Sequence, residues 1–105
     1  MTPRKLLDLG TDAITDGSQE AFSLSAADFA GNSRPIVVIK GLAGVETCSL
    51  WIAAGNDWEE VDDGSGTQET FTATAAHQLF NGAGQYGLTK DATAGALEVW
   101  LHTGR

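Results

Sequence analysis

The chain has 105 residues, 42% of them hydrophobic, and its fourteen acidic side chains against six Lys and Arg give a net charge of −8. This length and composition predict one folded domain with its own core. The negative charge opposes binding to nucleic-acid phosphates. No apolar run approaches the roughly 20 residues that span a membrane, so we expect neither nucleic acid nor membrane as a partner.

Residues 1–19 are polar and are interrupted by Pro3, Gly10 and Gly17, with a short apolar patch from Leu6 to Leu9. Charges interrupt the apolar part, which argues against a signal peptide. A helix over residues 4–9 is an alternative, but it is too short to be stable alone. We predict an extended N-terminal arm that orders on a partner. Its expected contact residues are Arg4, Lys5, Leu6 and Leu7.

From residue 20 to residue 105 the pattern is one of short β-rich segments separated by glycine-rich turns. We expect about seven strands and an all-β fold, a single antiparallel β-sandwich of the immunoglobulin-like or jelly-roll-like kind. The expected strands are EAFSLSA, PIVVIK, TCSLWIA, DWEEV, TFTATA, GQYGLTK and ALEVWLH.

Alternation of side chains along these segments assigns their faces. In ALEVWLH the aliphatic positions face inward, which turns Trp100 and His102 outward. In TCSLWIA the same argument turns Trp51 outward. The predicted inward set is Val37, Ile39, Cys48, Leu50, Ile52, Leu97, Val99 and Leu101.

Cys48 is the only cysteine, which excludes an internal disulfide and a cysteine-based zinc site. Its apolar setting, ETCSLWI, favours a buried and unreactive thiol, because a reactive thiol needs neighbouring cations. His77 and His102 belong to no metal-binding or catalytic motif.

The acidic cluster around Gly64 comprises Glu59, Glu60, Asp62 and Asp63. It lacks the alternating ligand spacing of a calcium-binding loop, and a solvated hairpin is the simpler interpretation. We therefore expect no metal, no cofactor and no enzymatic activity.

The stretch GAGQYG contains the spacing G-x-G-x-x-G at Gly82, Gly84 and Gly87. A dinucleotide-binding loop needs a helix after the motif and a long βαβ unit. The residues after Gly87 instead predict a turn and another strand. The net charge also opposes a pyrophosphate, so we do not expect nucleotide binding.

The same stretch resembles the immunoglobulin-like F-strand pattern D-x-G-x-Y-x-C, with Gly84 and Tyr86 at the glycine and tyrosine positions. Asn81 and Leu88 replace the aspartate and the cysteine. The resemblance implies that the Tyr86 hydroxyl bonds a nearby backbone group. Tyr86 and Leu88 then face inward, and Gly87 faces outward.

In an immunoglobulin-like order, Gly87 lies between the strands of Trp51 and Trp100. Two interpretations stay open. The indole rings shield the bare backbone of Gly87, or Trp51 and Trp100 form a contact surface with Gln85 and His102.

The tract from Pro35 onward, PIVVIKGLAGVETCSLWIAAGNDWEEVDDGSG followed by TFTATA and QYGLTKDATAGALEVWL, resembles small virion-associated proteins of tailed bacteriophages. The resemblance implies a non-enzymatic structural protein of the virion, assembled in the host cytoplasm. It would be a capsid decoration or cement protein, or a small head–tail or tail component.

The partners implied are the major capsid protein, a second copy of the chain, or both. Contact would be made through the arm and the face with Trp51 and Trp100. A carbohydrate- or protein-binding β-sandwich that uses these exposed tryptophans is the alternative.

Overall fold

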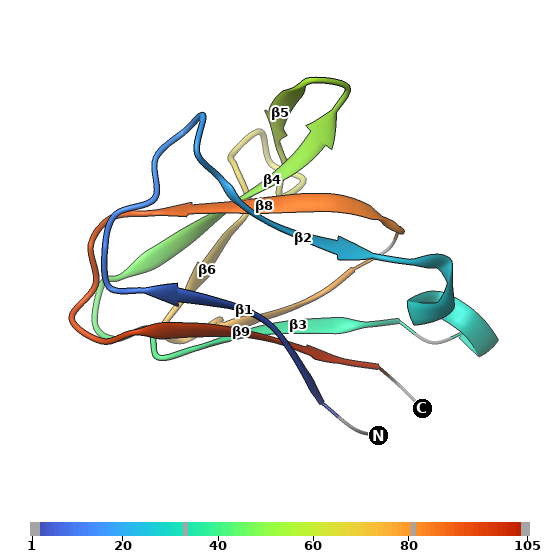
Figure 1. Ribbon diagram of the computed structural model, residues 1–105, viewed down its shortest axis with the longest axis horizontal. Helices are drawn as coiled ribbons and strands as arrows, with labels where there is room; N and C mark the ends of the chain where they lie inside the picture. The colour runs from blue at the N-terminus through green and yellow to red at the C-terminus, as the bar shows by residue number, and fades with distance from the viewer. Residues whose placement is uncertain (1–2, 33, 81, 104–105) are drawn as a thin grey trace.

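The computed structural model describes residues 3–32, 34–80 and 82–103, and in them two antiparallel sheets pack against each other (Figure 1). Sheet A has the strand order β1-β9-β3-β7. Sheet B has the order β2-β8-β4-β5, with β6 also paired to β4. The elements are β1 (Arg4–Gly10), β2 (Glu20–Leu24), the 3₁₀-helical segment η1 (Ala26–Asn32), β3 (Ile36–Lys40), β4 (Thr47–Ala54), β5 (Asp57–Glu60), β6 (Thr70–Thr72), β7 (His77–Leu79), β8 (Gly84–Lys90) and β9 (Leu97–His102). The all-β prediction is confirmed.

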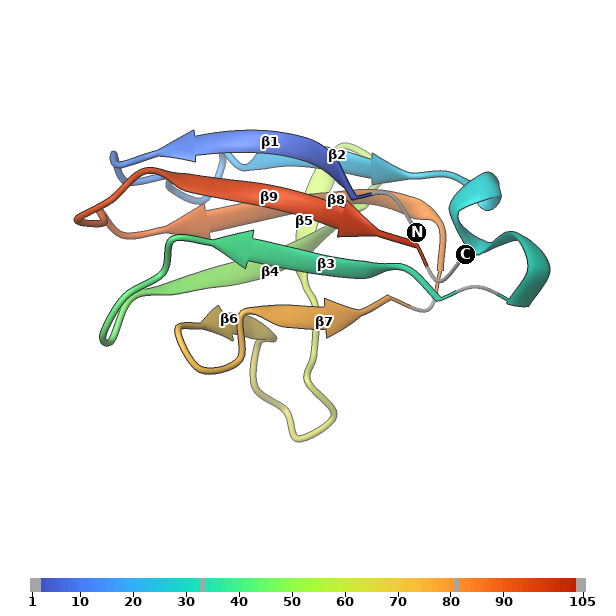
Figure 2. The same ribbon diagram turned by 90° about the horizontal axis from the view of Figure 1, so that it is seen from below.

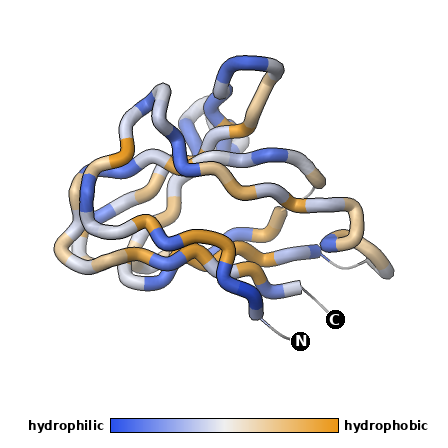
Figure 3. Tube along the Cα trace, viewed as in Figure 1, coloured by the Kyte–Doolittle hydropathy of each residue, from blue (hydrophilic) through white to orange (hydrophobic). Residues whose placement is uncertain are grey.

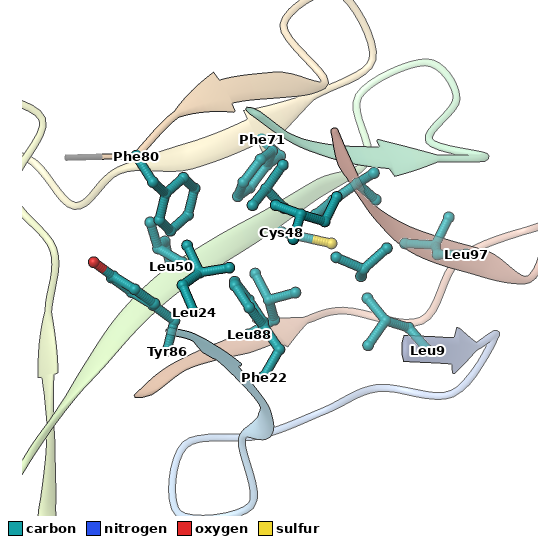
Figure 4. Packing of buried hydrophobic residues seen from close by; sticks show 14 residues of the cluster. Leu9, Phe22, Leu24, Cys48, Leu50, Phe71, Phe80, Tyr86, Leu88 and Leu97 are labelled. Carbon is teal, nitrogen blue, oxygen red and sulfur yellow. The ribbon is translucent and has the colours of Figure 1, made fainter. Parts of the chain in front are cut away.

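The core between the sheets contains the side chains that alternation turned inward (Figure 4). Seven of the eight predicted positions are buried, and the eighth, Ile52, is half-buried. Cys48 is a fully buried free thiol. Burial raises its pKa to about 11, which keeps the thiol protonated at neutral pH.

The N-terminal segment is part of sheet A, so the prediction of an arm outside the sandwich was wrong for the described residues. Strand β1 pairs with β9, and Leu9 is buried in the core. Further along, Ile14 exchanges two backbone hydrogen bonds with Lys90, at 2.8 and 3.0 Å. The register of β1 shifts twice, between Lys5 and Leu7 and between Asp8 and Gly10. Such bulges break the two-residue alternation by which a strand is recognised.

The segment after β2 closes one end of the sandwich. Ser25 and Asp28 form a capping arrangement in which Asp28 Oδ2 accepts hydrogen bonds from Ser25 N at 2.8 Å and Ser25 Oγ at 3.3 Å. This arrangement begins η1, which kinks at Ala30 and Gly31. No helix in the described part of the chain is long and apolar enough to cross a membrane.

Candidate interaction surfaces

No element formed by residues 3–32, 34–80 and 82–103 covers the outer face of sheet A. In Figure 2 this sheet lies nearest the viewer, and no other element crosses in front of β1, β9, β3 and β7. The pairing register places Trp100 between Lys5 and Val38, and Val38 in turn beside His77. We call this surface the sheet A face; its outward side chains are Lys5, Asp8, Ile36, Val38, Lys40, His77, Leu79, Glu98, Trp100 and His102.

Trp100 is anchored at its polar edge. Its Nε1 donates a hydrogen bond to Glu98 Oε1 at 3.0 Å, and Lys5 Nζ lies 3.9 Å from Glu98 Oε2. Lys5 also pairs with Asp8 at 3.2 Å. The half-buried indole leaves part of its apolar surface open to solvent. A hollow of about 330 Å³ lies beside it, lined by Pro3, Val38, Lys40, Trp100 and His102.

The other predicted contact residues of the N-terminal segment lie elsewhere. Arg4 is exposed, and its Nη2 lies 3.6 Å from Oδ1 of the buried Asp28. Leu6 and Leu7 are half-buried and pack against the core. Of the four, only Lys5 therefore lies beside Trp100 on the outer face of sheet A.

Trp51 and Trp100 do not share a surface, because their strands belong to different sheets. The immunoglobulin-like order expected β9 beside β8, whereas β9 lies between β1 and β3. Trp51 lies on the outer face of sheet B, where its Nε1 donates to Thr89 Oγ1 at 2.9 Å. Gln85 is exposed on this same sheet.

Gly87 is covered by the third tryptophan, which the sequence analysis did not single out. Gly87 pairs with Trp51 on one side and with Ala21 on the other. A Cβ atom built on Gly87 would lie 2.9 Å from Trp58 Cη2 and Cζ3 and 2.9 Å from Gln19 Cβ. The chain itself therefore shields this glycine through Trp58 and Gln19, and Trp100 takes no part.

The tyrosine implied by the F-strand resemblance behaves as expected. Tyr86 is buried, and its Oη donates to the carbonyl oxygen of Gly82 at 2.7 Å. Its ring stacks on Phe22, with centroids 5.7 Å apart, and meets Phe80 edge-on at 4.7 Å. Two members of this aromatic cluster, Phe80 and Tyr86, also line a cleft.

The cleft has a volume of about 320 Å³ and combines apolar side chains with two carboxylates. Gln78 Nε2 donates to Glu69 Oε1 at 2.8 Å and to the Thr70 carbonyl oxygen at 2.9 Å. The second carboxylate belongs to Asp62, whose Oδ1 accepts from the amides of Gly64 at 2.7 Å and Gly66 at 3.1 Å. The lining residues are Leu50, Ile52, Val61, Asp62, Glu69, Gln78, Leu79, Phe80, Gly82 and Tyr86.

The charge of the chain is unevenly distributed. No Lys or Arg occurs between Lys40 and Lys90, a stretch that carries seven acids: Glu46, Asp57, Glu59, Glu60, Asp62, Asp63 and Glu69. The β4–β5 hairpin projects from the sandwich (Figure 1), and its tip is hydrophilic (Figure 3). In the turn that follows, Asp63 Oδ1 accepts from Ser65 Oγ and Ser65 N, and these bonds lower the pKa of Asp63.

The histidines and acids form no metal-binding group within residues 3–32, 34–80 and 82–103. His77 and His102 both face outward on sheet A, as partners of Val38 and Ile36. No family model, curated protein or solved structure matches the chain.

Proposed function

We propose that the chain is a non-enzymatic structural protein of a tailed-phage virion that joins a protein assembly through the sheet A face. A capsid decoration or cement protein is the preferred role. The observation that carries the proposal is the half-buried Trp100 on the outer face of sheet A, a sheet outside which the described residues form no further layer. An apolar surface of this kind, rimmed by charges, is typical of protein–protein contact sites.

The strand order supports a jelly-roll assignment for the sandwich. A jelly roll pairs its eight strands, B to I, as two sheets with orders BIDG and CHEF. The orders β1-β9-β3-β7 and β2-β8-β4-β5 follow this scheme when β5 and β6 together take the F position. Jelly rolls form viral capsid proteins as well as lectins, so the assignment agrees with a virion protein and keeps a sugar-binding module as the alternative.

Trp100 and its aliphatic neighbours give the sheet A face its binding potential. Tryptophan is enriched at interface hot spots because it buries a large area with few rotatable bonds. Trp100 is flanked by Val38 and followed along the sheet by Ile36 and the exposed Leu79. A partner that covers these side chains removes a contiguous apolar surface from water.

Co-sedimentation with phage heads that lack the protein tests the role. We expect binding that Trp100→Ala weakens about tenfold or more, as for a hot-spot truncation, with little change in stability. Trp51→Ala is the matched control, because Trp51 lies on the opposite sheet. Equal loss of binding in both variants, or no binding of the unaltered chain to heads, would contradict the proposal.

A carbohydrate-binding module is the second candidate. It is supported by the outer face of sheet B, where Trp51 and Trp58 lie on neighbouring strands. Indole rings on one sheet face can stack on sugar rings. Quenching of tryptophan fluorescence by neutral oligosaccharides, lost in Trp58→Ala and kept in Trp100→Ala, would favour this candidate over the virion role.

A further inference from the structure

We infer that the cleft between the sheets is a binding site for an arginine side chain of a partner polypeptide. The cleft provides an apolar floor for the methylene groups and carboxylates for the guanidinium. The floor is formed by Leu50, Phe80 and Tyr86, which belong to the core. Ile52 and Val61 are half-buried beside it, so apolar surface within the cleft remains in contact with water.

The two carboxylates have acceptor capacity left. Glu69 Oε1 accepts one hydrogen bond from Gln78, and Asp62 Oδ1 accepts two from backbone amides. Neither carboxylate forms an ion pair with any base in the described part of the chain. The second oxygen of each group accepts no hydrogen bond from those residues. A carboxylate oxygen with free acceptor capacity suits a guanidinium, which forms short charge-assisted hydrogen bonds to carboxylates.

The surroundings select a cation. The cleft lies within the stretch of 49 residues, from 41 to 89, that carries seven acids and no Lys or Arg. Their combined field attracts positively charged groups and repels acidic ones. Arginine fits better than lysine, because its planar guanidinium can donate two parallel hydrogen bonds to one carboxylate and can also pack against aromatic rings. Tyr86 and Phe80 provide such rings in the cleft.

This inference rests on the cleft alone and not on the sheet A face or on a virion role. The probe is the blocked tripeptide acetyl-Gly-Arg-Gly-amide. Its control is the same peptide with citrulline, which has the shape of arginine without the charge. Titration is followed in the ¹H–¹⁵N NMR spectrum of the full chain. We expect shifts at Ile52, Val61, Gln78 and Gly82, with a dissociation constant on the order of 1 mM.

The citrulline peptide should bind about tenfold more weakly or worse, because a charge-assisted bond becomes a neutral one. Asp62→Asn and Glu69→Gln keep an acceptor for the internal hydrogen bonds and should each reduce the preference for arginine over citrulline severalfold. Glu60→Gln is the charge-matched control, since Glu60 is exposed and does not line the cleft. It should leave the preference intact.

Three results would overturn the inference: equal affinity for the arginine and citrulline peptides, shifts centred on Glu59 and Glu60, or the same loss from Glu60→Gln as from the cleft variants. The peptide comparison in the unaltered chain needs no variant, so it decides the question even where a substitution disturbs folding. Failure of binding to phage heads leaves this result unaffected.

Discussion

Replacing Gly87 with alanine tests which side chain covers this glycine on the outer face of sheet B. The new Cβ would lie 2.9 Å from two ring carbons of Trp58 and from Gln19 Cβ, whereas favourable carbon–carbon contacts lie at about 3.5–4.0 Å. The ring or the strand must therefore move by roughly 0.6 Å or more. Gly87 is not among the glycines with a positive φ, so the cost is steric and does not come from backbone strain.

Overpacking of this kind costs about 1–3 kcal/mol of unfolding free energy. Trp58 is half-buried, so it can swing outward, which places the expected value for Gly87→Ala near the lower end, about 1–2 kcal/mol. In a Trp58→Ala background two of the three close contacts are gone. Alanine also reduces the chain entropy lost on folding by about 0.5–1 kcal/mol relative to glycine. The contact with Gln19 Cβ at 2.9 Å remains, so the same substitution should then cost less but still require the Gln19 segment to shift.

Urea unfolding of the four proteins, followed by far-ultraviolet circular dichroism, gives the coupling free energy between positions 58 and 87. We expect about 1 kcal/mol of coupling, above the roughly 0.3–0.5 kcal/mol within which independent sites add. Additive effects would refute the assignment of Trp58 as the cover. A Trp100→Ala background serves as the control, and there the cost of Gly87→Ala should be unchanged.

The remaining predictions concern the core and its edge. Leu9→Ala should lower the unfolding free energy by about 2–4 kcal/mol, because it removes core packing supplied by β1. Deletion of residues 1–12 removes the same packing and should abolish the cooperative thermal transition. An unchanged transition in the deleted chain would restore the interpretation of these residues as a free arm. Tyr86→Phe should cost about 0.5–1.5 kcal/mol through loss of the bond to Gly82, measured by urea unfolding. The raised pKa of Cys48, about 11 against an ordinary 9.0, means that the folded chain holds the thiol proton more tightly. Its contribution to stability is therefore complete below pH 9 and falls by about 1.4 kcal/mol per pH unit between pH 9 and 11, a slope that Cys48→Ala should lack.

Local alternation predicted the faces of β3, β4 and β9 because each of these strands runs without interruption along a two-sided sheet. The same method missed β1, where the register shift between Lys5 and Leu7 places Lys5 opposite the outward Trp100 and Leu7 opposite the inward Val99. In a regular strand these two residues would share a face. It also missed η1, whose start depends on a short-range bond between Ser25 and Asp28. A search for S-x-x-D spacing finds that signal.

The candidate surfaces were harder to predict because they depend on which strands become neighbours. The outward directions of Trp51 and Trp100 follow from their own strands. Whether they share a face depends on β9 leaving the side of β8 for sheet A, which alternation does not determine. The F-strand resemblance predicted the Tyr86 hydrogen bond correctly, because that bond joins residues four positions apart. It predicted β9 as a neighbour of β8 incorrectly, because strand order depends on residues far apart in the sequence.

The cleft illustrates the same limit, because its carboxylates come from the loop between β5 and β6, whereas its floor comes from β4, from β8 and from Phe80 after β7. The available sequence signal was the absence of bases between residues 40 and 90. That distribution predicts an anionic region but not a hollow within it. The hollow also depends on long-range strand pairing, including that of β6 with β4 and of β7 with β3.

The cleft and the sheet A face meet at the edge strand β7, and this contact makes them one extended surface. Gln78 turns inward and lines the cleft, while the preceding residue, His77, faces outward beside Val38. Leu79 belongs to both, since it lines the cleft and pairs with Ile36 on the outer face. A partner segment that places an arginine in the cleft brings its flanking residues next to Leu79 and Ile36. The entropy lost on ordering that segment is then lost only once for both contacts. An apolar residue next to the arginine should therefore add more affinity than the same residue contributes in a peptide that lacks the arginine.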